Sequence, residues 1–313
     1  MIKPHALKDG DTVAVVAPSS PIKPENLEVT RSVLESLGLK PKFYPSCHLR
    51  HGHLAGPDVD RATDVNAAFA DPEAKAVFCL RGGYGTPRLL EKIDYDLIRN
   101  NPKIFLGYSD ITGLHVALNR QCGLITFHGP TAYSEDIFNH PGEYTQTHLK
   151  QALFNPKPLG RYAAPEGESL ETLIGGVCEG EVVGGNLSLL TSALGSPYEI
   201  DTRGKILFIE EVSEFNYVID RMLMSLDLSG KFRDCAGVLL GTWQGCTAEQ
   251  GYQDKVDGSL ASIFEEILYK YNKPIVNNFR AGHVSPQFTI PMGTRIRLDA
   301  DKKEVTFLES ATR

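Results

Sequence analysis

The chain has 313 residues, of which 42% are hydrophobic and 23% charged, a composition typical of a globular protein long enough for two domains with separate cores. A formal net charge of −7 without any block of basic residues argues against nucleic acid as a partner. No run of 18 apolar residues occurs, and Pro18 breaks the first apolar run, so we expect no membrane segment, no secretory signal and a cytoplasmic location.

The first half of the chain alternates short apolar segments with segments of helical periodicity. The expected strands are "TVAVVAP" (12–18), "KFYP" (42–45), "KAVFCL" (75–80), "KIFLGY" (103–108) and "LITF" (124–127). The expected helices lie at 27–37, 59–69, 86–93 and 110–121. Nearly continuous apolar strands that alternate with helices predict a parallel sheet covered on both faces. We therefore expect an N-terminal α/β domain over residues 1–150.

The second half has a different character. Residues 151–175 are rich in proline, glycine and charge, which is typical of a linker. Beyond them, 176–313 predicts a mixed α+β domain with a small twisted or barrel-like sheet. Its expected elements are strands at 181–185, 205–211, 236–241 and 273–278, helices at 186–194, 214–228 and 259–271, and a hairpin at 294–310.

Polar and glycine-rich residues follow several strands of the first domain. These segments are Pro18 to Ser20, "RGGYG" (81–85), Tyr108 to Asp110 and "FHGP" (127–130). Turn chemistry explains any one of them. Because ligands of parallel sheets bind beyond the carboxyl ends of the strands, four such segments predict a site at this edge.

Ser109 stands where an apolar strand, Ile104 to Leu106, runs into a helix. In this setting a serine either caps the helix or acts as a nucleophile on a sharp turn. The amide of Asp110 would then face a developing oxyanion, and a second amide could come from Gly82 or Gly83, where no Cβ blocks close approach. The segment "GYSDI" differs from the G-x-S-x-G elbow at its last position, so the motif alone is weak.

A serine nucleophile needs a base and a group that orients the base. His128, at the end of a neighbouring strand, and His283, in the second domain, are equal candidates for the base. Strand alternation sends Glu210 and Glu211 to opposite faces, so only one of them can face the site.

Other chemistries fit less well. No P-loop is present, and "RGGYG" follows the third strand, so a dinucleotide site is weakly supported. The segment "CHLRHGH" gathers Cys47, His48, His51 and His53, but its spacing fits no standard zinc pattern. The six cysteines contain no C-x-x-C pair and are expected to be reduced thiols. We expect neither a metal nor a cofactor.

Five motifs that span nearly the whole chain carry a resemblance to a known family. They are "RGGYGTPRLL", "FLGYSDITGL", "GGNLSLL", "LFIEEVSEFNYVIDRML" and "GHVSPQFTIPMG". In this order they closely resemble the serine LD-carboxypeptidases, also called muramoyltetrapeptide carboxypeptidases. The resemblance implies a catalytic triad of Ser109, His283 and Glu210, with an oxyanion hole at Asp110 and Gly83. It also implies an N-terminal domain similar to class I glutamine amidotransferases, a swivelling barrel-like C-terminal domain and a homodimer.

The activity that this resemblance implies is release of the terminal D-alanine from murein tetrapeptides in peptidoglycan recycling. The terminal carboxylate of the peptide would be held by Arg81, or by the amides around Ser19 and Ser20. Two alternatives stay open. One is a microcin-type self-immunity peptidase, which is expected to carry an extended aromatic loop; "GTWQGCTAEQGYQD" (241–254), with Trp243 and Tyr252, is short for that role. The other is a non-catalytic module that binds an anionic ligand.

Overall fold

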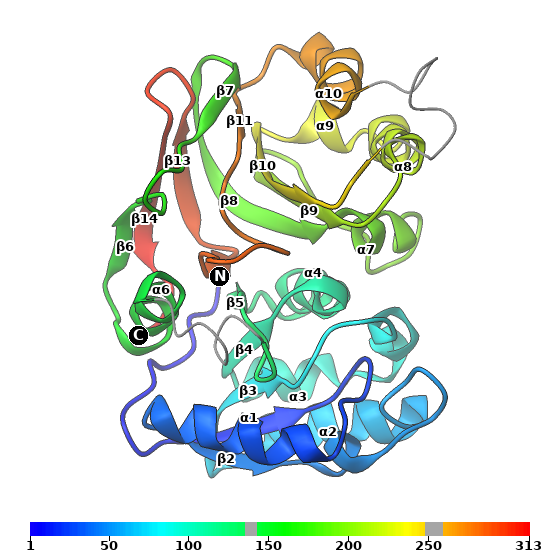
Figure 1. Ribbon diagram of the computed structural model, residues 1–313, viewed down its shortest axis with the longest axis vertical. Helices are drawn as coiled ribbons and strands as arrows, with labels where there is room; N and C mark the ends of the chain where they lie inside the picture. Colours follow the sequence, from blue (N-terminus) through cyan, green and yellow to red (C-terminus); the bar gives the residue numbers. More distant parts are fainter. Residues whose placement is uncertain (135–142, 248–258) are drawn as a thin grey trace.

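The computed structural model describes residues 1–134, 143–247 and 259–313. The chain forms two lobes, each built on one β-sheet with helices packed against it (Figure 1). The fold class predicted from the sequence, an α/β lobe followed by a mixed lobe with a curled sheet, is confirmed.

The first sheet has six strands in the order β12-β5-β4-β3-β1-β2. Five of them are parallel: β1 (Thr12–Val16), β2 (Lys40–Phe43), β3 (Ala74–Cys79), β4 (Ile104–Gly107) and β5 (Thr126–His128). The sixth, β12 (Ile290–Met292), comes from the C-terminal half and runs antiparallel to β5. No local pattern in the sequence predicts this sixth strand, which joins the two lobes at one edge of the sheet.

Helices cover both faces of the first sheet, as the apolar strands predicted. One face packs on α1 (Glu25–Ser36) and α6 (Glu143–Phe154), and the other on α2 (Asp58–Ala70), α3 (Tyr95–Asn100) and α4 (Thr112–Ala117). Short helical turns complete the lobe: Pro45–His48, Thr86–Lys92 and Ser109–Ile111 are 3₁₀ turns, and Leu118–Cys122 is a π turn. The single helix expected at 110–121 is thus three successive turns of different pitch.

The second sheet has eight strands in the order β6-β14-β13-β8-β9-β10-β11-β7. Their bounds are β6 Pro158–Arg161, β7 Glu171–Ile174, β8 Val177–Asn186, β9 Ile206–Val212, β10 Gly237–Gln244, β11 Ile275–Asn277, β13 Arg295–Asp299 and β14 Glu304–Ser310. The helices α7 (Leu187–Ser192), α8 (Asn216–Leu228), α9 (Lys231–Asp234) and α10 (Leu260–Leu268) lie along β8 to β11 (Figure 1), and the 3₁₀ turn Tyr269–Tyr271 follows α10. The opposite face curls around a core that contains Phe208, Phe279 and Phe288.

The segment 151–175 corrects one expectation. It was predicted to be a linker, but it contains β6 and β7, which form the two edges of the second sheet. Proline lacks a backbone donor and is tolerated at the first residue of an edge strand, which is where Pro158 lies. The composition that indicated a linker therefore belongs to edge strands and their connections.

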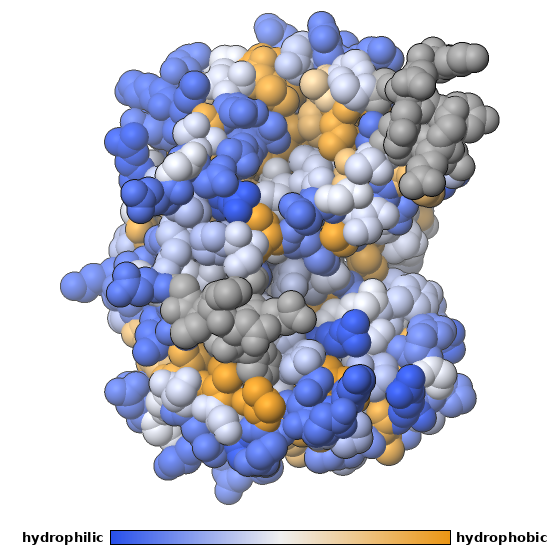
Figure 2. Space-filling model, in the orientation of Figure 1, coloured by the Kyte–Doolittle hydropathy of each residue, from blue (hydrophilic) through white to orange (hydrophobic). Residues whose placement is uncertain are grey.

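The face in Figure 2 is mostly hydrophilic, with apolar residues in separate patches. Within the described ranges, no helix combines the length and apolar character needed to cross a membrane.

Candidate active site

Ser109 lies on a sharp turn between β4 and α4. Tyr108 is extended, with φ −150°, and Ser109 then takes a φ of +65°, which is uncommon for a residue other than glycine. Gly107 allows the turn to pack tightly, because a Cβ there would lie 2.9 Å from Ile111 and 3.1 Å from the Cβ of Cys79. A strained turn at the end of a strand is typical of a side chain that takes part in chemistry, which favours the second of the two roles expected for Ser109.

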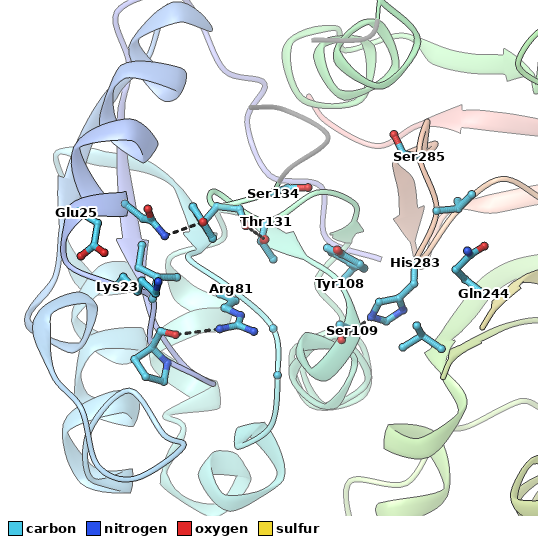
Figure 3. Close-up of a pocket in the computed structure, with 18 of the residues that line it drawn as sticks. Lys23, Glu25, Arg81, Tyr108, Ser109, Thr131, Ser134, Gln244, His283 and Ser285 are labelled. Atoms are coloured by element: carbon cyan, nitrogen blue, oxygen red, sulfur yellow. Dashed lines mark hydrogen bonds between the residues drawn. The ribbon is translucent and has the colours of Figure 1, made fainter. Parts of the chain in front are cut away.

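His283 and Glu210 meet Ser109 from the other lobe. The Nε2 atom of His283 lies 2.9 Å from Ser109 Oγ, and its Nδ1 atom lies 2.7 Å from Glu210 Oε2. The backbone N–H of His283 also donates to Glu210 Oε2, at 3.2 Å. Gly282 permits this approach, since a Cβ there would lie 2.5 Å from the same oxygen. The structure thus brings together three residues that are far apart in sequence, and Figure 3 shows Ser109 beside His283.

The charge of Glu210 sets the protonation of His283. Burial alone would lower the pKa of His283, but the hydrogen bond and charge of Glu210, with the charge of Glu211, outweigh burial and raise it. Glu210 is fully buried, so its attraction is poorly screened. In the neutral imidazole, Nδ1–H donates to Glu210, which leaves Nε2 free to accept the proton of Ser109.

His128, the other candidate base, lies behind the site. It is fully buried and contacts the rings of Tyr108 and Phe208, at centroid distances of 6.2 and 5.3 Å. Burial, together with the neighbouring imidazoles His115 and His283, holds the pKa of His128 well below its ordinary value. The hydrogen bond to Ser109 comes from His283, so the geometry favours His283 as the base.

Asp110 stabilises the turn that carries Ser109. Its Oδ2 accepts hydrogen bonds from Ser19 Oγ at 2.5 Å and from the Thr86 amide at 2.9 Å. Burial raises the pKa of Asp110, although these hydrogen bonds oppose the shift. Ser19 is itself fully buried and lies beneath the turn. The hydroxyl of Ser19 is therefore engaged by Asp110, and the expected contact of the amides around Ser19 with the substrate carboxylate stays a prediction.

The glycine loop after β3 passes directly beside the nucleophile. A Cβ on Gly82 would lie 2.9 Å from the Cβ of Ser109, so any larger residue here would force neighbouring atoms to move. Gly83 has a φ of +115° and packs against Ser20, whose Oγ a Cβ would approach to 2.2 Å. The amide of Ser20 donates to Gly82 O at 3.3 Å. Ser20 therefore supports the glycine loop. It does not line the adjoining cleft.

A cleft of about 1390 Å³ opens over Ser109 and His283, lined by residues of both lobes. Among the described lining residues, the cations are Lys23, Arg50, Arg81 and Arg280, and the single acid is Glu25. A positive cleft in a chain of net charge −7 favours anionic ligands. The exposed Arg81 donates to the Pro21 carbonyl at 3.2 Å and lines the cleft beside the glycine loop (Figure 3).

A second buried network was not predicted. Glu211, on the face of β9 opposite Glu210, accepts from Asn186 Nδ2 at 2.7 Å and from both the amide and the hydroxyl of Ser188, at 2.8 and 2.6 Å. The amide of Asn186 in turn donates to Thr112 Oγ1 at 3.0 Å, in the helix that follows Ser109. The sequence predicts the alternation of the two glutamates but does not identify the hydrogen-bond partners of Glu211.

The cysteine- and histidine-rich segment does not gather into a metal site. Cys47 is buried and its thiol contacts the Val15 carbonyl, whereas His48, His51 and His53 are exposed. Across the ranges 1–134, 143–247 and 259–313, no group of three or more side chains is arranged to hold a metal ion.

Comparisons with known proteins identify the family to which the chain belongs. Residues 13–129 match the LD-carboxypeptidase N-terminal domain, and residues 179–298 match the LD-carboxypeptidase C-terminal domain. The chain is 43% identical to a probable murein peptide carboxypeptidase of Bacillus subtilis, over 96% of this chain and 92% of that protein. The structure of the microcin C7 self-immunity protein MccF with aspartyl sulfamoyl adenosine is similar at a TM-score of 0.90, with 26% identity and 100% of both chains covered. A muramoyltetrapeptide carboxypeptidase from Oxalobacter formigenes is similar at a TM-score of 0.81, with 27% identity over 94% of this chain and 97% of that one. With a relative of this identity along almost its whole length, the chain belongs to the LD-carboxypeptidase family.

Proposed function

We propose that this protein is a serine carboxypeptidase that hydrolyses the L,D amide bond to the terminal D-alanine of murein tetrapeptides. The observation that carries the proposal is the unbroken hydrogen-bonded series from Ser109 through His283 to the buried Glu210, set in a cleft with a cationic lining. The relatives named for murein peptides and muramoyltetrapeptides support this substrate class.

In the proposed mechanism, His283 Nε2 takes the proton of Ser109 as Oγ attacks the carbonyl carbon of the scissile amide. The amide of Asp110 and an amide of the Gly82–Gly83 loop stabilise the oxyanion of the tetrahedral intermediate. His283 then gives its proton to the nitrogen of D-alanine, which leaves and generates an ester on Ser109. A water molecule, deprotonated by His283, hydrolyses that ester and restores the serine.

A carboxypeptidase must also recognise the free carboxylate one residue beyond the scissile bond. Arg81 is the cation best placed for this, because it precedes Gly82, which lies against Ser109. An arginine can bind a carboxylate through two parallel hydrogen bonds, which fixes the position as well as the charge. The family resemblance adds that the protein works without a metal, in the cytoplasm and as a homodimer, and these remain parts of the proposal.

One alternative has structural support. The TM-score is 0.90 for the MccF structure and 0.81 for the muramoyltetrapeptide carboxypeptidase. The higher value for MccF favours a peptidase that acts on an aminoacyl nucleotide. Against it, the ring of Trp243 packs on Phe264, at a centroid distance of 5.0 Å, and does not line the main cleft. Tyr252, the other aromatic residue expected there, lies outside the described residues.

The decisive assay compares the wild type with Ser109→Ala on an L,D-linked murein tetrapeptide and on aspartyl sulfamoyl adenosine. We expect the wild type to release one alanine from the tetrapeptide, seen by mass spectrometry, and the variant to release none. Cleavage of the nucleoside derivative alone would select the alternative peptidase. Binding of the tetrapeptide by both proteins without turnover would leave the non-catalytic module as the explanation.

A further inference from the structure

The loop that carries His283 is closed at its base by one residue, Arg280. The amide of Phe288 donates to the Arg280 carbonyl at 2.7 Å, which joins the two ends of the loop. The guanidinium of Arg280 then reaches across and donates to the Ser285 carbonyl at 3.1 Å. Backbone and side chain of the same arginine therefore bracket His283 on both sides.

Glu168 holds this arginine from a different part of the chain. Its Oε1 lies 3.4 Å from the Nη1 atom of Arg280. Its Oε2 accepts from the side chain of Asn278, at 3.3 Å, where the backbone turns through a φ of +63°. The hydroxyl of Tyr162 accepts from the Arg280 amide at 3.2 Å. The connection between β6 and β7 thus contacts the start of the His283 loop through both Glu168 and Tyr162.

The ion pair of Arg280 and Glu168 is partly buried, which restricts the movement of both side chains. The side chain of Arg280 is 16% exposed and that of Glu168 is 35% exposed, whereas Arg295 and Glu179, which form an ion pair across β13 and β8, are 62% and 39% exposed. Exposed pairs contribute little because water screens them and the side chains remain free to move. Arg280 also makes a second, directed contact with the loop, which a lysine could not reproduce together with the ion pair.

We propose that Arg280 and Glu168 are positioning residues that keep His283 in hydrogen-bonding distance of Ser109, an inference that rests on the proposed function. The contacts of His283 with Glu210 fix its Nδ1 side and its backbone, but they form a pivot about a single carboxylate oxygen. The contacts of Arg280 and Glu168 at the base of the loop, here called the clamp, prevent rotation of His283 about this oxygen. A misplacement of about 1 Å costs roughly 100-fold in rate, even when its cause lies outside the chemistry.

Loss of the clamp is expected to change the pH dependence of the reaction, which a smaller amount of folded protein would not do. If the loop loosens, His283 loses part of its hydrogen bond to Glu210, which opposes the effect of burial, and its pKa falls toward the ordinary value. The base must be neutral to act, so the acidic limb of the pH–rate profile moves to lower pH while the plateau falls. A smaller folded fraction would lower the plateau without moving the limb.

The test measures the pH dependence of kcat/KM on the tetrapeptide and, in parallel, the rate at which a fluorophosphonate labels Ser109. Arg280→Ala and Glu168→Ala are each expected to lower both rates by about 10- to 100-fold, with the acidic limb moved down. The double variant should be no slower than the worse single variant, because the two residues act as one unit. Arg280→Lys should recover part of the loss, and Arg295→Ala, the matched control, should behave as wild type.

Glu168→Gln, which keeps the size of the side chain, covers the case in which Arg280→Ala fails to fold; it should show a smaller loss in the same direction. Losses that multiply in the double variant, or an unmoved acidic limb, would overturn the clamp. If the wild type is labelled on Ser109 but does not cleave the tetrapeptide, the proposed substrate fails, and the labelling rates alone still decide the role of the clamp.

Discussion

The contact between Gly82 and Ser109 allows a one-atom perturbation of the nucleophile. Gly82→Ala adds a single Cβ, which would lie 2.9 Å from the Cβ of Ser109 and 3.2 Å from its Oγ. The φ of Gly82 lies outside the left-handed region, so alanine is compatible with the backbone and the perturbation is steric. Real Cβ atoms essentially never approach other atoms this closely, so Ser109 or the glycine loop beside it has to move, and either movement changes their relative position.

The size of the effect follows from that displacement. An ordinary contact begins at about 3.4 Å, so Ser109 and the glycine loop must move apart by roughly half an ångström. The bond from Ser109 Oγ to His283 Nε2, now 2.9 Å, would be stretched or misaligned. With roughly 100-fold lost per ångström of misplacement, we expect kcat/KM to fall by at least tenfold, which corresponds to about 1.4 kcal/mol of transition-state stabilisation.

The assay is steady-state release of alanine from the tetrapeptide, with unfolding followed in urea to confirm that the variant is folded. Gly175→Ala is the matched control, because a Cβ there would meet only the carboxylate of Asp301, and neither residue lines the cleft. A folded Gly82→Ala enzyme with wild-type kcat/KM would refute the argument that this glycine sets the position of the nucleophile.

Three further predictions concern the groups around the nucleophile. Because His283 acts in its neutral form and its pKa is raised, the acidic limb of kcat/KM should lie above the ordinary 6.5, and Glu210→Gln should move it down and cost about 10⁴-fold; a limb below 6.5 in the wild type would contradict this. Arg81→Ala should raise KM for the tetrapeptide with a smaller effect on kcat. Ser19→Ala, beneath the turn, should instead lower kcat and leave KM almost unchanged. Steady-state kinetics that show the reverse pattern would count against these assignments. Glu211→Ala should leave buried donors unpaired and lower the free energy of unfolding by about 3 kcal/mol, measured in urea, and an unchanged midpoint would show that the network does not stabilise the fold.

The parallel sheet of the first lobe could be read from the sequence because its strands are buried on both faces and its helices are amphipathic. The strands β1, β3, β4 and β5 lie within one or two residues of the apolar segments that predicted them, and α2 (Asp58–Ala70) matches its expected span. What the sequence missed is β12, whose three residues pair with a strand more than 150 residues earlier. Such pairing leaves no local pattern, because it depends on where the second lobe returns the chain.

The candidate site divides in the same way. The turn at Ser109 and the opposite orientation of the two glutamates follow from local rules, and the structure has both. The choice between His128 and His283 could not be made from spacing, because His128 ends a strand of the first lobe, His283 lies in a loop of the second, and the deciding quantity is a tertiary distance. The bond from the Ser19 hydroxyl to Asp110 could not be predicted for a similar reason, because a serine after a strand can face the cleft or the buried Asp110 with no change in the sequence pattern.

In the proposed mechanism, the imidazole of His283, from the other lobe, makes Ser109 nucleophilic. The most direct measurement is mass spectrometry of the protein after exposure to a fluorophosphonate, comparing the wild type with His283→Ala. We expect a single adduct on Ser109 in the wild type and little or none in the variant. An adduct on another residue, or equal labelling of Ser109 in both proteins, would contradict it.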